Sequence, residues 1–566
     1  MTPRLVERPP RRRAGRKPAS MRLVERRIGL LFAAFLALLT VAVLRGGWLA
    51  TVRAGALRSR ALTQHVQQLT VPAHRGTITD RHGVDLAVSQ DSITVFANPF
   101  LIKDPGRVAG KLTPLIGRSK AELLPILGDR RRGFAYLARR LDPAVGKKVE
   151  SLRLAGIGTL VESKRAYPQG ELASQVIGSV GGDDQGLTGL EQARDRTLRG
   201  EDGRRRLVRD ALGQAIRIVD TKEARPGKDL RLTLDSAIEA RVEVVLAGVG
   251  REFRPRGATA LVMDPRDGQL LALANWPRVD ANDLGGAPAY ARQDRAVAAS
   301  YEPGSTFKPI TVSGALEERL VTPDTPFTLP PTIQVADRTI RDAETRGTET
   351  MTTAQILAQS SNVGAVTIGL KLGEQRFDRY VRRFGFGRPT GIDLPGEAPG
   401  IVPTPRQYSG SSMGNLPIGQ GLAVTPVQMA AAYAAIAGHG VIHEPYVVEG
   451  EGRRGRRVIS RRTADRVSRM LEGVFGPNGT APEARIPGYT LAGKTGTAQK
   501  PDGHGGYSST KYVASFIGYA PARRPRLLVA VMVDEPKGEI YGGLVAAPAF
   551  QKIMEFALPY LRIPPR

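Results

Sequence analysis

The sequence has no cysteine among its 566 residues, which excludes disulfide bonds, thiolate metal sites and a cysteine nucleophile. Its six histidines show no metal-ligand spacing such as HExxH. No repeat of fixed period is visible. We therefore expect neither a metal ion nor any other cofactor.

Acidic residues are in the minority: the chain has 54 Asp and Glu but 82 Lys and Arg, which gives a formal charge of +28. Such a chain favours anionic neighbours, namely nucleic acid, anionic lipid or an acidic polymer. Residues 1–27 hold ten basic and two acidic residues, and the remaining excess is spread thinly without an aromatic-interleaved basic motif. Nucleic-acid binding is therefore not expected, and anionic lipids or acidic polymers are the better hypothesis.

One segment near the N-terminus, residues 28–44, carries no charge. As a helix it would measure about 26 Å, near the short end of a transmembrane helix. A cleaved signal peptide is the alternative, but the run is longer than a typical signal core and no small-residue cleavage site follows it directly. We interpret residues 28–50 as an uncleaved transmembrane signal anchor. The positive-inside rule then places the basic tail, residues 1–27, in the cytoplasm and the later residues outside it.

The rest of the chain divides near Pro226-Gly227. Residues 51–227 mix short strands and helices with loop-heavy stretches, as in an irregular pedestal. Residues 228–566 carry strand and helix signals at both ends; these are a helix capped by Asp235, a hairpin at Ala258–Met263 and Gln269–Ala274, strands at Tyr512–Tyr519 and Leu527–Val533, and a helix at Ala549–Ala557. This arrangement predicts a large α+β domain whose sheet joins early and late segments.

The first candidate motif is Ser305-Thr306-Phe307-Lys308. We predict a helix over residues 305–320, where positions i and i+3 share a face, so that Lys308 reaches the Ser305 hydroxyl. A lysine whose pKa is lowered by burial can take the serine proton and create a nucleophile. Alone the signal is weak, because a helix cap followed by a solvated lysine has the same pattern. A second such motif, Ser508–Lys511, lies in a Gly-rich stretch and is interpreted as a chance match in a loop.

The second candidate is Ser360-Ser361-Asn362, between helical runs predicted at residues 353–359 and 363–372. A sharp joint between two helices can push side chains into a cleft. Ser360 could pass a proton between Lys308 and an amine, and Asn362 could hydrogen-bond a substrate amide. A pair of helix-capping serines is the alternative.

The third candidate is Lys494-Thr495-Gly496-Thr497, in a strand predicted over residues 489–498. Gly496 removes a side chain where another backbone would approach closely, so an extended peptide could pair along this strand. Lys494, Thr495 and Thr497 offer a positive charge and hydroxyl groups to a carboxylate. A Thr-rich edge strand with a surface lysine is the alternative.

The three motifs in this order match a known catalytic set, and the chain resembles the penicillin-binding protein and serine β-lactamase superfamily. From about residue 71 to residue 557 it is similar to class B penicillin-binding proteins of the cell-division type. The stretches that carry this similarity are Arg75-Gly76-x-Ile78-x-Asp80-Arg81-x-Gly83, Tyr301-Glu302-Pro303-Gly304, Ile418–Gly421 with Thr425-Pro426, Val533–Pro536 and Tyr541–Pro548.

The resemblance implies the fold of a penicillin-binding transpeptidase domain, an antiparallel sheet with helices, at residues 228–566. It also implies an elongated, mixed pedestal (dimerisation-like) module at residues 51–227. The implied activity is that of a serine-type peptidoglycan D,D-transpeptidase, which cross-links stem peptides in septal cell-wall synthesis and is the target of β-lactams. A SEDS-family glycosyltransferase and other division proteins of the bacterial cell membrane are implied partners.

The resemblance also implies roles for the motif residues. Ser305 would attack the penultimate D-Ala carbonyl with Lys308 as base, and Ser360 and Asn362 would complete the catalytic group. Lys494, Thr495, Gly496 and Thr497 would bind the terminal carboxylate, and backbone N–H groups of Ser305 and Thr497 would form the oxyanion hole.

Several alternatives remain: a β-lactam hydrolase or sensor, a transpeptidase of elongation or sporulation, and a non-enzymatic division scaffold. Ser361 stands where class A β-lactamases carry Asp, and no counterpart of their deacylating Glu is found. Both points favour a transpeptidase over a hydrolase. The intact motifs argue against a scaffold.

Overall fold

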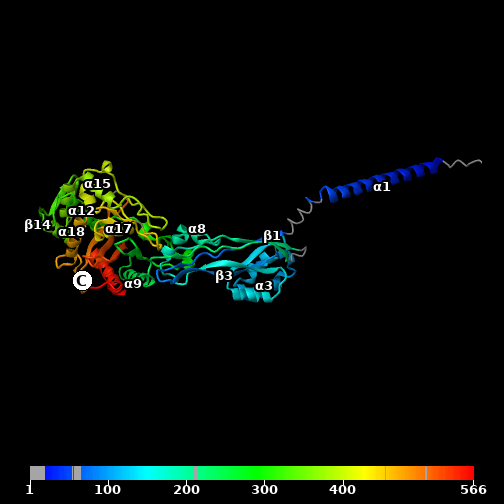
Figure 1. The fold of residues 1–566 in the computed structure, drawn as a ribbon, viewed down its shortest axis with the longest axis horizontal. Helices are drawn as coiled ribbons and strands as arrows, with labels where there is room; N and C mark the ends of the chain where they lie inside the picture. The colour runs from blue at the N-terminus through cyan, green and yellow to red at the C-terminus, as the bar shows by residue number, and fades with distance from the viewer. Residues whose placement is uncertain are drawn as a thin grey trace, which may run out of the picture. The chain divides into compact units, whose positions relative to one another are not determined.

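The computed structural model describes residues 19–53, 55, 66–209, 215–452, 454–503 and 506–565. The chain divides into two compact units, residues 1–71 with 202–224 and residues 72–201 with 225–566. Each unit has its own β-structure. Figure 1 labels the main elements of both units.

The first unit contains the long apolar helix α1 (Ala19–Thr51) and one small sheet. Within α1, the 26 residues Arg26–Thr51 are long and apolar enough to cross a membrane. The predicted anchor, residues 28–50, lies inside this helix, whereas residues 1–18 of the predicted tail lie outside the described residues. The sheet of this unit is antiparallel, in the order β1 (Val66–Val71), β6 (Gly203–Arg209) and β7 (Ala215–Lys222).

The second unit begins with a sheet built around the long strand β3 (Asp85–Ala97). Its other strands are β2 (Ile78–Thr79), β4 (Ala135–Leu141), β5 (Ile157–Ala166) and β8 (Leu230–Arg231). Three helices pack against it around a small apolar core, namely α3 (Pro105–Ile116), α4 (Lys120–Gly128) and α5 (Pro143–Ser151). Helix α4 contains Pro125, and a capping box between Ser119 and Glu122 begins it.

The Arg75 side chain is fully buried in this part of the chain. Its Nε lies 2.5 Å from Glu191 Oε2, and its Nη1 lies 2.7 Å from Asp195 Oδ1. Arg165 Nε lies 2.7 Å from the other oxygen of Glu191. A buried guanidinium is tolerated only when it is paired and hydrogen-bonded, so this part of the family-like stretch has a structural role.

A second five-stranded sheet is antiparallel throughout, in the order β10-β9-β19-β18-β17. It joins β9 (Gly257–Met263) and β10 (Leu270–Trp276) to β17 (Ala492–Pro501), β18 (Tyr507–Ala520) and β19 (Leu527–Asp534). The predicted hairpin and the predicted union of early and late segments are therefore confirmed. Strand β17 is at one edge, with β18 as its partner.

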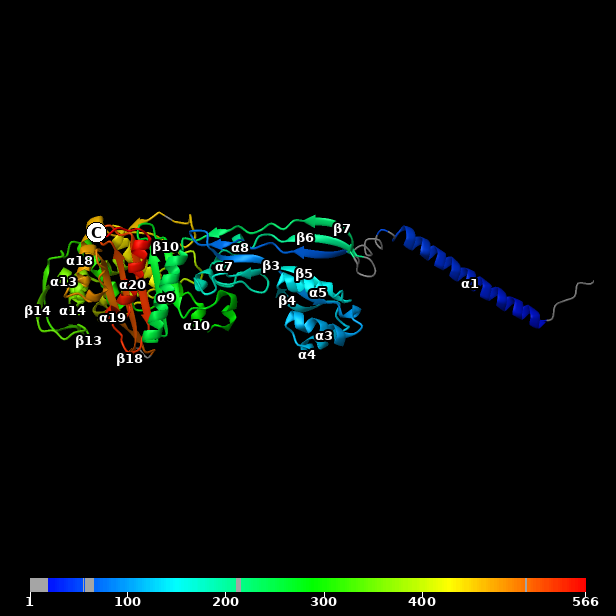
Figure 2. The same ribbon diagram turned by 90° about the horizontal axis from the view of Figure 1, so that it is seen from below.

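The two faces of this sheet are buried against different helices. Ala258, Ala260 and Val262 of β9 share a core with α9 (Ser236–Phe253) and α20 (Ala547–Tyr560). Leu261 and Met263 point to the opposite face, as the two-residue period of a strand requires. Figure 2 shows α9 and α20 along the sheet. Asp235 caps α9 as predicted.

The second face carries the helices α12 (Lys308–Glu317), α13 (Thr353–Ala358), α14 (Asn362–Leu372), α17 (Pro426–Ala437) and α18 (Arg461–Glu472). The first two candidate motifs lie at the starts of α12 and α14. The remaining helices and strands are α6 (Ser174–Ile177), α7 (Gly189–Ala193), α8 (Asp195–Leu198), α10 (Ala289–Arg292), α11 (Arg295–Ala298), β11 (Pro326–Leu329), β12 (Thr332–Val335), β13 (Arg338–Arg341), β14 (Glu349–Thr352), α15 (Glu374–Arg383), α16 (Ser412–Asn415), β15 (Val441–Ile442), β16 (Arg456–Arg457) and α19 (Gly542–Val545).

Candidate active site

Ser305 lies in a short 3₁₀-helix, Gly304–Phe307, directly before α12. The predicted continuous helix from residue 305 to residue 320 is wrong in this detail. In such an α-helix Pro309 would have to donate to the Ser305 carbonyl, but proline has no N–H. The N–H of Lys308 donates to that carbonyl instead. Because side chains at i and i+3 eclipse in a 3₁₀-helix, the turn still brings Ser305 and Lys308 to one side.

The Lys308 side chain is completely buried. Its Nζ donates to the carbonyl oxygen of Ser360 at 2.5 Å, to the Ser360 hydroxyl at 3.2 Å and to Asn362 Oδ1 at 2.8 Å. A protonated lysine has three N–H donors, so these three acceptors match its full donor capacity. The first two candidate motifs therefore meet at this nitrogen, whereas the expected contact between Lys308 and the Ser305 hydroxyl stays a prediction.

Burial lowers the pKa of Lys308 to about 7. The carboxylate of Asp342 opposes this shift, and the guanidinium of Arg346 adds to it. Burial dominates because the charged ammonium loses its water shell. An amine of pKa about 7 exchanges its proton near neutral pH, which suits a general base.

Ser360 occupies the joint between α13 and α14, as predicted. Its φ of +60° is in the left-handed region, which is uncommon for residues other than glycine. Ser361 caps α14, and its hydroxyl accepts a hydrogen bond from the N–H of Gly364 at 3.0 Å. The capping alternative is thus right for Ser361, while Ser360 and Asn362 turn toward Lys308.

Asp342 is a site residue that the sequence analysis missed. Its Oδ1 accepts hydrogen bonds from the Ser361 hydroxyl at 3.1 Å, from the Asn362 N–H at 2.5 Å and from the Val363 N–H at 3.0 Å. It follows strand β13 and acts on a helix that begins twenty residues later, so no local spacing signals it. The carboxylate thereby holds the Ser360–Asn362 joint in place.

Lys494 and Thr495 lie on β17, and both are buried. Burial, followed by the positive charge of Lys308, lowers the pKa of Lys494 well below its usual value. Lys494 Nζ donates to the carbonyl and hydroxyl oxygens of Thr495 at 3.2 and 3.3 Å. The alternative of a surface lysine is wrong, because Lys494 is buried. Its amine also lies near enough to that of Lys308 for the two positive charges to repel each other.

Gly496 is the point where β17 passes close to the Ser305 turn. A Cβ at this position would lie 2.4 Å from Ser515 Oγ, 2.8 Å from Thr306 Cγ2 and 3.0 Å from Pro303 O. Only glycine fits this approach without displacing its neighbours. The third motif therefore lies against the first.

The second Ser-x-x-Lys match is in a strand rather than in the predicted loop. Ser508 and Lys511 belong to β18, and the Lys511 side chain is exposed. The Ser508 hydroxyl accepts a hydrogen bond from the backbone N–H of Lys511 at 3.1 Å. Lys511 lies at the surface, so this pair lacks the buried environment of Lys308.

Family comparisons agree with this geometry. The model of the penicillin-binding protein transpeptidase domain matches residues 258–555, and that of the penicillin-binding protein dimerisation domain matches residues 70–232. The chain is 33% identical over 542 residues to stage V sporulation protein D of Bacillus subtilis, covering 92% of this chain and 84% of that protein. It is 31% identical over 547 residues to the peptidoglycan D,D-transpeptidase FtsI of Escherichia coli, covering 95% and 92%.

A solved structure is similar as well. Penicillin-binding protein 3 of Mycobacterium tuberculosis, crystallised with aztreonam, matches with a TM-score of 0.69 and 30% identity, covering 88% of this chain and 98% of that one. The buried Lys308, the joint at Ser360 and the adjoining strand β17 lie within the region that matches the transpeptidase domain. The chain therefore belongs to the class B penicillin-binding proteins, the family of peptidoglycan D,D-transpeptidases.

Proposed function

We propose that the protein cross-links peptidoglycan stem peptides during septal wall synthesis, through an acyl-enzyme on Ser305. The observation that carries this proposal is Lys308, fully buried beside Ser360 and Asn362 with a pKa of about 7. Lys308, once neutral, takes the Ser305 proton, and Ser305 Oγ bonds to the carbonyl carbon of the penultimate D-Ala. The peptide C–N bond then breaks, and terminal D-Ala leaves with that proton, relayed through Ser360.

The second half of the reaction reverses these steps with a different amine. The amine of another stem peptide attacks the ester carbonyl, its proton passes to the base, and the C–O bond to Ser305 breaks. Asn362 binds a substrate amide, and the N–H groups of Ser305 and Thr497 bind the oxyanion. An extended stem peptide pairs along the free edge of β17, where Lys494, Thr495 and Thr497 hold its terminal carboxylate.

The proposed organisation follows the same resemblance. Residues 1–27 form a cytoplasmic tail, 28–50 the membrane anchor, 51–227 the pedestal and 228–566 the transpeptidase domain. The catalytic domain then lies outside the cytoplasm, where stem peptides occur. A SEDS-family glycosyltransferase and division membrane proteins are the proposed partners.

Labelling with a fluorescent penicillin tests the nucleophile. Ser305→Ala should abolish covalent labelling, whereas the matched control Ser508→Ala should label like the parent protein. Labelling of Ser305→Ala at the parent rate would refute the assignment. A label that leaves the parent protein within seconds would instead support a β-lactam hydrolase.

The septal role requires a test in cells. A tagged protein should gather at the division site, and Ser305→Ala should fail to support septal growth. Localisation along the side wall or only in sporulating cells would favour elongation or sporulation, consistent with the match to stage V sporulation protein D. Septal growth supported by Ser305→Ala would instead favour a scaffold.

A further inference from the structure

A cavity of about 410 Å³ lies in the part of the chain that belongs to the transpeptidase domain. It is formed where the end of α15, the loop that follows it, α17 and the β15–β16 hairpin come together. Its volume is in the usual range of small-molecule sites. Lys308, Ser360, Asn362 and the residues of the third motif are not among the described residues that line it.

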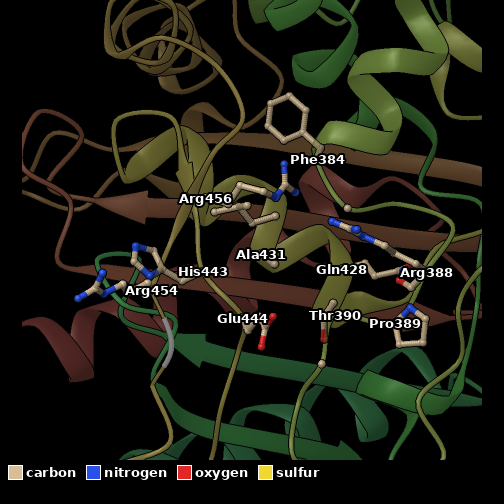
Figure 3. Close-up of a pocket in the computed structure, with 13 residues that line it drawn as sticks. Phe384, Arg388, Pro389, Thr390, Gln428, Ala431, His443, Glu444, Arg454 and Arg456 are labelled. Carbon is tan, nitrogen blue, oxygen red and sulfur yellow. Dashed lines mark hydrogen bonds between the residues drawn. The ribbon is translucent and has the colours of Figure 1, made fainter.

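The charged side chains of this cavity are mostly arginines. Arg388, Arg454 and Arg456 line it, against the single carboxylate of Glu444. Figure 3 shows Arg388 and Arg456 extending toward each other, while Arg454 lies beside His443 at the other end. The three arginines and Glu444 together carry a net charge of two positive units.

Arg388 and Arg456 also lack an acidic neighbour of their own. Neither lies within ion-pair distance of a carboxylate in the part of the chain that the structure describes. Arg456 Nη2 donates to the backbone carbonyl of Arg383 at 2.7 Å, which leaves its charge uncompensated. Burial and the nearby guanidinium groups of Arg388 and Arg383 lower the pKa of Arg456. The like charges thus repel one another, in contrast to Arg75 with its two carboxylates.

The wall beneath these arginines is suited to the body of a ligand. Phe384, Ala431 and Gln428 are buried, and Ile442 is half-buried. Gln428 Nε2 is already used, because it donates to the carbonyl oxygens of Arg388 and Pro399 at 2.8 and 3.0 Å. Those bonds fix the loop that carries Arg388. The cavity therefore combines a cationic rim with a floor of mixed polar and apolar groups.

We propose that this cavity binds the phosphate group of a ligand, with the anion between Arg388 and Arg456 and the organic part against Phe384 and Ala431. Guanidinium groups bind phosphate oxygens through paired, charge-assisted hydrogen bonds. A phosphate monoester or a pyrophosphate group carries two or more negative charges and balances the net charge of the lining residues, whereas a phosphodiester headgroup or a carboxylate carries one and balances half of it. The source is either a soluble phosphate compound or the headgroup of an anionic phospholipid.

Isothermal titration of the full-length protein in a non-ionic detergent at low salt tests this site. Inorganic pyrophosphate should bind saturably at one site. Arg388→Gln and Arg456→Gln should each weaken binding about tenfold or more, as expected for the loss of one charge-assisted contact. Arg524→Gln is the matched control, because this exposed arginine of the β18–β19 loop carries the same charge away from the cavity.

A second titration distinguishes the two sources. A short-chain phosphatidylglycerol below its critical micelle concentration should compete with pyrophosphate if the source is a lipid headgroup. Failure to compete, with pyrophosphate binding retained, assigns the site to soluble phosphate compounds. Phosphatidylcholine of the same chain length controls for the acyl chains and carries no net charge.

Two results would overturn the proposal. One is the absence of saturable pyrophosphate binding to the parent protein, and the other is equal weakening by Arg524→Gln and by the cavity variants. Labelling of Ser305 by fluorescent penicillin is an independent check of folding, and we expect Arg388→Gln and Arg456→Gln to label normally. Failure at this cavity is thereby distinguished from failure of the acyl-transfer proposal.

Discussion

The Nζ atom of Lys308 lies 3.2 Å from the hydroxyl of Ser360, although 52 residues separate them in the sequence. This hydrogen bond connects the turn that carries Ser305 to the joint between α13 and α14. The Ser360 hydroxyl is therefore placed to receive the proton that Lys308 would accept from Ser305. The proposed chemistry therefore depends on the protonation state of a buried amine.

The rate of acylation should depend on pH through Lys308. Only the neutral amine accepts a proton, so below its pKa of about 7 the second-order rate constant for benzylpenicillin should rise about tenfold per pH unit and then level off. Stopped-flow measurements from pH 5.5 to 9 give this profile. Lys308→Met should lower the plateau by about 100- to 10,000-fold. A flat profile in the parent protein would contradict the role of Lys308 as base.

Asp342 and Arg346 should shift that profile in opposite directions. The Asp342 carboxylate raises the pKa of Lys308 and the Arg346 guanidinium lowers it. Asp342→Asn keeps an oxygen that can accept hydrogen bonds from the first N–H groups of α14, but it removes the negative charge. The midpoint of the acylation rate against pH should therefore move to lower pH. Arg346→Met should move it to higher pH. Shifts of the same sign, or no shift in either variant, would show that these charges do not tune Lys308.

Gly496→Ala should damage both stability and acylation. The new Cβ would lie 2.4 Å from Ser515 Oγ and 2.8 Å from Thr306 Cγ2, so β17 or the Ser305 turn must move. Overpacking of this kind costs about 1–3 kcal/mol. Thermal unfolding and penicillin acylation measure the two effects. Gly347→Ala is the control, since a Cβ there meets no atom within 4 Å, and equal behaviour of the two variants would refute the argument.

Glu239→Gln should stabilise the protein at alkaline pH. Burial raises the pKa of both Glu239 and Glu243 on α9, and the negative charge of Glu243 raises the pKa of Glu239 further. At pH values above the ordinary pKa of glutamate, the folded state therefore binds more protons than the unfolded state. The free energy of unfolding then falls as the pH rises from that ordinary pKa to the raised pKa of the folded state. The amide keeps an acceptor for the N–H of Leu273, which donates to Glu239 Oε2 at 2.7 Å.

Thermal unfolding at pH 5 and pH 8 measures this effect. We expect a gain of about 1–2 kcal/mol for Glu239→Gln at pH 8 and a smaller one at pH 5. Glu252→Gln, an exposed position on the same helix, should change stability little at either pH. Destabilisation of Glu239→Gln at pH 8 would show that the ionised carboxylate is needed there.

Local sequence patterns determined much of the fold. Asp235 caps α9, the turn at Asp267-Gly268 lies between β9 and β10, and Ser361 caps α14, because caps and turns depend on neighbouring residues. The uncharged run near the N-terminus likewise predicted the helix within Arg26–Thr51. The helix over residues 305–320 was less accurate, since the missing N–H of Pro309 converts its first turn to a 3₁₀-helix.

The order of the three motifs identified the family, and the sequence by itself also set Ser305 apart from Ser508. Only the tertiary structure decided which groups act on Lys308: it buried the amine, placed Ser360 and Asn362 on it, and brought Asp342 to the start of α14. It also placed β17 at a sheet edge and brought Arg388, Arg454 and Arg456 together around one cavity. The physical reason is that burial and electrostatic fields depend on distances between segments far apart in the chain, which no local spacing encodes.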